Sequence, residues 1–185
     1  RAYTSQAPSR LEVVASDDDP RITQALVEDD YARVVDVLER HYNLILLDTG
    51  TGILDSATRG ILALADQLVV VMAPSLDGAR AASLTLDWLD QHGHQALTSN
   101  AVAVINAVRE RRGLIELERV SEHFSLRCRE VIDIPFDAEL EAGATSAPED
   151  LRAATRDSYL GLAAAVAGGF AESARTNTHN VKVNR

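Results

Sequence analysis

Short apolar runs separated by helix-length segments constrain the fold of this chain more than any other feature. Amphipathic patterns at helical spacing lie between these runs, for example over residues 29–41 and 76–93. Strands that are apolar on both faces are typical of parallel sheets covered by helices on both sides. The alternation therefore predicts an α/β fold, with a three-layer α/β/α arrangement and a mostly parallel sheet. The four predicted strands are Leu44–Leu47, Gln67–Met72, Ala101–Ile105 and Glu130–Ile134.

Composition narrows the class of protein. The chain has 185 residues, 46% of them hydrophobic, which is enough for one domain with a substantial core. A net charge of −10 argues against general binding of nucleic acid, because phosphate contacts need a basic face. The single cysteine, Cys128, excludes an internal disulfide framework, and no apolar run is long enough to span a bilayer. We expect one domain, or the larger C-terminal part of one, over residues 1–172, followed by a disordered polar tail over 173–185.

The first apolar run ends in an acidic residue and a glycine-rich turn, Asp48-Thr49-Gly50-Thr51-Gly52. An inner parallel strand would bring the Asp48 carboxylate to the edge of the sheet where α/β proteins bind ligands. In a nucleotide hydrolase this carboxylate would hold Mg²⁺ through a water, and the Gly52 amide would meet a γ-phosphate oxygen. The alternative is an Asp that caps its own turn, and the residues alone favour neither interpretation.

The same letters also spell Asp-Thr-Gly, the triplet of aspartic proteases, in which two carboxylates share a proton. That chemistry needs a β-rich fold and a second copy of the triplet. Helical patterns follow the triplet here, so a dimeric aspartic protease is a minor alternative.

Two later strand ends carry residues suited to a nucleotide base. Asn106 follows the third strand, and its carboxamide can pair with both donor and acceptor edges of an adenine. Pro135 and Asp137 lie in Ile134-Pro135-Phe136-Asp137 at the end of the fourth strand, where a proline loop could wall off a base. An ordinary Asx-turn at Asn106 and a simple strand stop at Pro135 are the alternatives. Together, the three strand ends favour a binding edge more than any one does.

The lysine content limits a nucleotide-binding interpretation. A P-loop needs a lysine after its glycines, and the sole lysine of this sequence is Lys182. A nucleotide-binding fold in this chain would therefore lack its phosphate-gripping segment.

The order of these motifs resembles the MinD/ParA family of deviant P-loop ATPases. The resemblance extends over about residues 3–170 and rests on Asp48–Gly52, Ala65–Val71, Val104–Asn106 and Ile134–Asp137. Residues 42–52, 76–88 and 103–113 also resemble an ATPase region associated with mycobacterial type VII (ESX) secretion. The family's N-terminal strand and P-loop would precede Arg1.

The resemblance implies ATP and Mg²⁺ as cofactors, with Asp48 in a Walker B role and Gly52 as the second catalytic residue. It implies nucleotide contacts from the remaining site residues, Gly50, Thr51, Asn106, Pro135 and Asp137. It further implies a homodimer that regulates or energises secretion, with ESX components as partners. Some members of the family bind DNA or membranes, but the net charge of −10 argues against nucleic acid and residues 173–185 have no apolar face for direct membrane insertion. We therefore expect a cytoplasmic protein. A non-catalytic interaction module of the secretion machinery is the alternative function.

Overall fold

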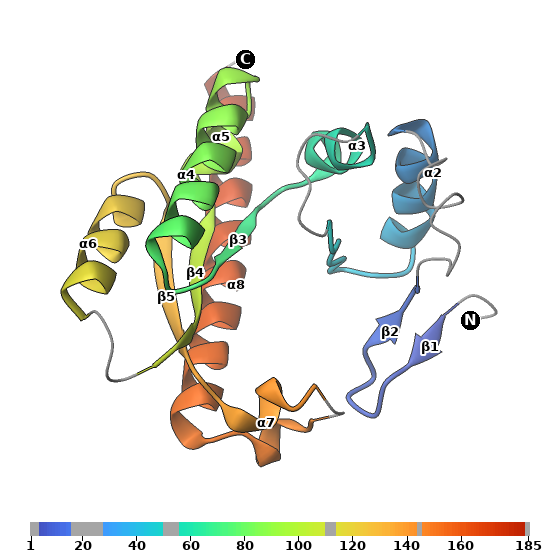
Figure 1. The fold of residues 1–185 in the computed structure, drawn as a ribbon. Coiled ribbons are helices and arrows are strands. Elements are labelled where there is room, and N and C mark those ends of the chain that lie inside the picture. Colours follow the sequence, from blue (N-terminus) through green and yellow to red (C-terminus); the bar gives the residue numbers. More distant parts are fainter. Residues whose placement is uncertain (1–3, 16–27, 50–55, 110–113, 144–145, 184–185) are drawn as a thin grey trace. The chain divides into compact units, whose positions relative to one another are not determined.

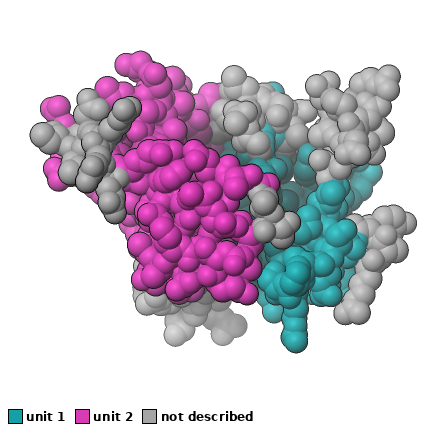
Figure 2. Space-filling model, turned by 60° about the horizontal axis from the view of Figure 1, so that its bottom comes forward, with its two compact units in different colours: residues 1–65 teal, residues 66–185 magenta. Residues whose placement is uncertain are grey.

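The computed structural model describes residues 4–15, 28–49, 56–109, 114–143 and 146–183. The chain forms two compact units, residues 1–65 and 66–185, which Figure 2 colours separately. Each unit is described by itself. The prediction of one domain over residues 1–172 stays a prediction.

The first unit contains a small antiparallel ribbon and a pair of helices (Figure 1). The ribbon pairs β1 (Ser5–Gln6) with β2 (Glu12–Val13). The helices α2 (Glu28–Glu39) and α3 (Ser56–Leu64) pack against each other, as amphipathic helices do when each has an apolar stripe to bury. Among the described residues of this unit, the buried apolar side chains are those of Val35, Ile61 and Leu62.

The predicted strand Leu44–Leu47 is not formed, so this prediction is wrong for the structure. Residues 44–49 have neither helix nor strand, and the side chains of Leu44 and Leu46 are 54% and 73% exposed. The physical reason is that a strand exists only through hydrogen bonds to a neighbour. Within the described ranges of the structure, no strand pairs with these residues.

The second unit contains the predicted parallel sheet, with strand order β3-β4-β5. The strands are β3 (Val69–Met72), β4 (Val102–Val108) and β5 (Glu130–Pro135), and both pairings are parallel. β4 is the central strand, which explains why its first residues are almost completely buried. This confirms the α/β class and a parallel sheet, and it leaves no place for the β-rich fold of an aspartic protease.

Helices lie on both faces of this sheet, which gives three layers (Figure 1). On one face are α4 (Leu76–Gln91) and α6 (Leu114–Ser125), which contact β3 and β5, respectively, and also each other. On the opposite face lies α8 (Ala153–Val183), which packs on β4 and β5. Ala165 of α8 belongs to one buried cluster with Val102 and Val104 of β4 and Ile134 of β5. Short helices α5 (Gln95–Ser99), α7 (Ala138–Glu141) and the 3₁₀ turn η1 (Pro148–Asp150) complete the unit.

The ends of α4 follow from local chemistry. The Ser75 hydroxyl accepts a hydrogen bond from the Gly78 N–H at 3.1 Å, so it satisfies one of the free donors of the first turn. Gly93, with φ +90°, follows the C-cap and allows the chain to leave the helix.

The helix α8 includes residues 173–183, which we expected to form a polar tail. Gly168 and Gly169 do not stop it. Once a helix is nucleated, each further residue adds one hydrogen bond, so two glycines weaken a helix without ending it. No helix in the described part of the chain is both long and apolar enough to cross a membrane.

Candidate functional site

The carboxyl end of β4 has an irregular backbone around Asn106. We expected the strand to end at Ile105, but it continues to Val108, with a change of register between Ile105 and Val108. Ala107 has φ +62°, a conformation that costs an L-residue about 1–2 kcal/mol. Bulges of this kind re-aim side chains and are common beside active sites. Here Asn106 is exposed immediately after five buried residues, 101–105.

The carboxyl end of β5 lies next to this irregularity. Pro135 is the last residue of the strand and is partly buried, and the next residue, Phe136, donates its N–H to the Val108 carbonyl at 2.8 Å. The two strands are therefore held together as far as their last residues. Asn106 and Pro135, which the sequence placed at one edge of a predicted sheet, belong to neighbouring strands at the same end of it.

The Asp137 carboxylate is used inside the protein. It is 5% exposed and caps α7 by accepting a hydrogen bond from the Glu139 N–H at 3.2 Å. It also accepts the Arg152 N–H at 3.0 Å, and the Arg152 Nε lies 3.7 Å away. The backbone bond from Arg152, followed by the nearby Thr155 hydroxyl, lowers the pKa of Asp137 below its ordinary value.

The buried Thr155 hydroxyl lies close enough to influence that carboxylate. Within the described residues, however, it makes no hydrogen bond of good geometry. The backbone donors are therefore the secure partners of Asp137. A carboxylate that binds the Glu139 and Arg152 amides positions the segment after β5, and its predicted contact with a nucleotide stays a prediction.

Asp48 lies in the other unit, in the exposed segment without helix or strand. The predicted loop residues Gly50, Thr51 and Gly52 lie outside the described residues. The structure therefore brings Asn106, Pro135 and Asp137 to one end of a sheet, and it describes Asp48 separately from them.

The candidate site residues offer few side chains that could bind Mg²⁺ directly. Among the described residues, no group of three or more His, Cys, Asp or Glu side chains is placed to hold a metal ion. Mg²⁺ commonly uses one or two carboxylates, several waters and the phosphates of its nucleotide, so a single carboxylate such as Asp48 fits that pattern. The exposed carboxamide of Asn106 fits a base edge.

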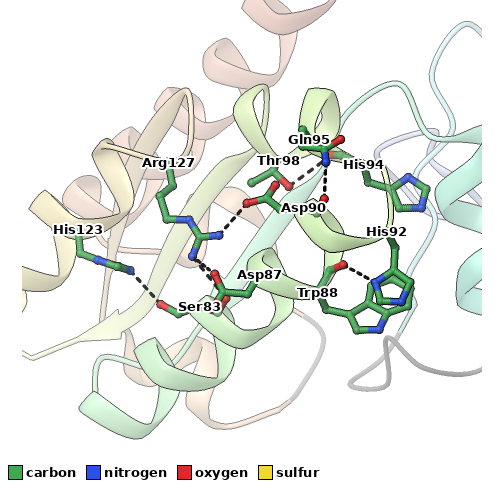
Figure 3. A network of polar contacts seen from close by, with 10 residues as sticks. All are labelled: Ser83, Asp87, Trp88, Asp90, His92, His94, Gln95, Thr98, His123 and Arg127. Atoms are coloured by element: carbon green, nitrogen blue, oxygen red, sulfur yellow. Dashed lines mark hydrogen bonds and ion pairs between the residues drawn. The ribbon is translucent and has the colours of Figure 1, made fainter.

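Sequence reasoning missed a polar network on the α4 face, which Figure 3 shows. Arg127 bridges two acidic residues of α4, with its Nη1 2.7 Å from Asp87 and its Nη2 2.9 Å from Asp90. The His123 ring nitrogen lies 3.0 Å from the Ser83 hydroxyl. These contacts join the end of α6 to α4, so their role is structural. The i, i+3 spacing of the two aspartates on one helix face was the signal available in the sequence.

His92 and His94 lie beside the same network and belong to no group of three or more metal-ligating side chains among the described residues. His92 stacks on Trp88 with ring centroids 4.0 Å apart, and its Nδ1 lies 2.7 Å from the Trp88 carbonyl oxygen. This arrangement caps the end of α4.

Comparison with known proteins finds similarity to part of a secretion-associated protein and to the fold of a ParA family ATPase. No protein-family profile matches the sequence. The chain is 34% identical over 177 residues, 95% of its length, to the ESX-1 secretion-associated protein EspI of two Mycobacterium tuberculosis strains, CDC 1551 and H37Rv. It spans 27% of the length of these curated relatives.

Among solved structures, a ParA family ATPase from Chlorobium tepidum TLS superimposes with a TM-score of 0.59 and 20% sequence identity. The match covers 75% of this chain and 55% of the other. At this level of identity the likeness establishes the fold. Nearly the whole chain is therefore related to part of EspI, and its fold is that of ParA family ATPases.

Proposed function

We propose that this chain is part of a MinD/ParA-like, ATP-binding switch that regulates or energises type VII protein secretion. The switch would act by an ATP-dependent conformational change or by formation of a homodimer, in the cytoplasm, with ESX secretion components as partners. The relation to EspI supports the secretion role, and the likeness to a ParA family ATPase supports a nucleotide as the ligand.

The observation that carries the proposal is the exposed Asn106 on a strained bulge at the carboxyl end of the central strand. Open α/β sheets bind ligands at this end. A backbone strain of about 1–2 kcal/mol at Ala107 persists only where the surrounding structure enforces it, and such strain is concentrated at functional sites. In this role Asn106 reads the adenine edge, and the loop from Pro135 borders the base.

The remaining predicted site residues would either contact Mg²⁺ and the phosphates of the nucleotide or support the loop beside the base. Asp48 would orient a water of Mg²⁺, and Gly50, Thr51 and Gly52 would follow the state of the γ-phosphate. Mg²⁺ would supply charge neutralisation for the phosphates when bound. Asp137 would act through its cap, by fixing the loop that follows Pro135 rather than by touching the nucleotide.

The proposal is tested by titrating Mg·ATP into the 185-residue chain and into its Asn106→Ala and Asp48→Ala variants by calorimetry. We expect the wild-type chain to bind Mg·ATP. Asn106→Ala should weaken the affinity at least ten-fold, because the variant has no carboxamide and the adenine loses both of its hydrogen bonds. Asn100→Ala is the matched control, since Asn100 is only the C-cap of the short helix α5. Light scattering with and without Mg·ATP would measure homodimer formation.

A non-catalytic interaction module is the second candidate, and the lysine content favours it. The chain has one lysine, Lys182, so it contains no P-loop lysine to grip the phosphates. This candidate predicts no change in affinity for ESX components on adding Mg·ATP. An Mg·ATP-dependent change in their capture by the chain would contradict it.

A further inference from the structure

A second planar side chain, Arg109, lies just after the end of β4 and has no part in the proposed function. The guanidinium of Arg109, three residues after Asn106, lies over the ring of Phe136, with its Cζ 3.5 Å from the ring centroid. Its Nη2 is held by the Glu141 carboxylate of α7 at 3.0 Å. Two contacts from separate elements therefore fix both the position and the plane of this guanidinium.

Arg109 makes an aromatic contact that an ordinary surface ion pair lacks. The Arg109 side chain remains 59% exposed, although one of its faces lies on Phe136. By comparison, Arg80 pairs with Asp77 of its own helix at 3.5 Å and is 75% exposed, and no aromatic ring in the described part of the chain lies beneath it. Exposed pairs of the latter kind contribute little to stability. Arg109 thus presents an accessible guanidinium face at the ligand-binding end of the sheet, held by a ring contact as well as by an ion pair.

The chemistry of this plane favours a base over a phosphate. A guanidinium face stacks on aromatic rings and on nucleobases, whereas phosphate binding uses its N–H edge. Part of that edge is occupied by Glu141, whose carboxylate also offsets the positive charge. The Phe136 N–H bond to the Val108 carbonyl holds the backbone of the residue whose ring contacts Arg109.

We propose that Arg109 is a binding residue that stacks on the purine base read by Asn106, with Phe136 and Glu141 as positioning residues. This inference rests on the proposed nucleotide function. It adds an affinity determinant for the base, independent of any phosphate grip.

Nuclear magnetic resonance of the ¹⁵N-labelled 185-residue chain tests the inference, because it detects binding in the millimolar range. The probes are adenosine, ATP with Mg²⁺, and sodium tripolyphosphate, added separately. We expect adenosine and ATP to move the Arg109 Nε–H and the Asn106 carboxamide signals, and tripolyphosphate to leave Arg109 unchanged. Arg109→Lys keeps the charge and removes the plane, so it should weaken adenosine binding about 5-fold or more, the range of base stacking. Arg80→Lys is the matched control and should leave binding unchanged.

The outcomes separate the two proposals. If adenosine moves Asn106 and binds Arg109→Lys as tightly as the wild type, the stacking role is overturned and the nucleotide site stands. If tripolyphosphate moves Arg109 and its binding is weakened in Arg109→Ala, the residue contacts phosphate, and the assignment to the base is overturned. If neither adenosine nor ATP moves any signal, the nucleotide function itself fails, and the role of Arg109 fails with it.

Discussion

Two apolar segments of similar composition have opposite fates in this molecule. Ala101–Ile105 leads into the central strand of the second unit, and Ala101, Val102, Ala103 and Ile105 are completely buried. Leu44–Leu47 in the first unit is at least as apolar, but it has no strand partner among the described residues and three of its side chains are exposed. Hydrophobicity therefore makes a segment suitable for a sheet, and hydrogen-bonded neighbours on its edges make it a strand.

The largest expected effect tests this contrast directly. Ile105→Ala should lower the free energy of unfolding by about 2–5 kcal/mol, because it removes a fully buried side chain from the core. Leu46→Ala should change it by less than about 0.5 kcal/mol, because Leu46 is 73% exposed. Urea unfolding of both variants measures the difference. A cost above about 1 kcal/mol for Leu46→Ala would show that Leu44–Leu47 is buried in solution, and the contrast between the two segments would be lost.

The second prediction tests how tightly α4 packs against the end of β3 in the second unit. In α4, a Cβ on Gly78 would lie 2.5 Å from the Ala73 carbonyl oxygen, which belongs to the backbone just after β3. Gly78→Ala should therefore cost about 1–3 kcal/mol through overpacking, despite the better helix propensity of alanine.

Gly161→Ala in α8 is the control for that change. A Cβ at Gly161 has nothing within 4 Å, so this variant should be neutral or more stable by up to about 1 kcal/mol. Thermal unfolding of both variants gives the comparison. Equal stability of the two variants would mean that α4 sits less tightly against the end of β3 than the structure indicates.

The smallest expected effect is a pH dependence at the end of β5. Because the folded-state pKa of Asp137 is lowered, its carboxylate stabilises the fold above the unfolded value of about 3.9. That stabilisation is lost as the pH falls through the lower folded pKa. Asp137→Asn should therefore lower the free energy of unfolding at pH 7 and flatten its decline in acid, as measured by urea unfolding from pH 2 to pH 7.

Asp133 provides a control of opposite sign for the same experiment. Desolvation raises the pKa of Asp133, although the residue is exposed, so the folded state slightly favours its protonated form and its charge slightly disfavours folding at neutral pH. Asp133→Asn should raise the free energy of unfolding at pH 7 and have little effect in acid. The same sign for both variants at pH 7 would contradict the roles assigned to the two carboxylates.

Much of the second unit is predictable from the sequence. The strands β3, β4 and β5 and the helices between them follow from apolar runs and from helical spacing such as that over residues 76–93. The carboxyl ends of parallel strands meet at one edge, so Asn106 and Pro135 could be placed at the same end of the sheet. Their roles in nucleotide binding stay predictions.

Local sequence alone indicated the α/β class, the helical segments and the apolar segments suited to a sheet, because these depend on side chains within a few residues of one another. The tertiary structure decided what depends on distant partners. In the folded chain the Asp137 carboxylate accepts the Arg152 N–H, the backbone bulges at Ala107, and the Arg109 guanidinium stacks on the Phe136 ring. The tertiary structure also left Leu44–Leu47 without a strand partner in the described residues. The reason is that hydrogen bonds and stacking contacts form between residues that only the folded backbone brings within reach.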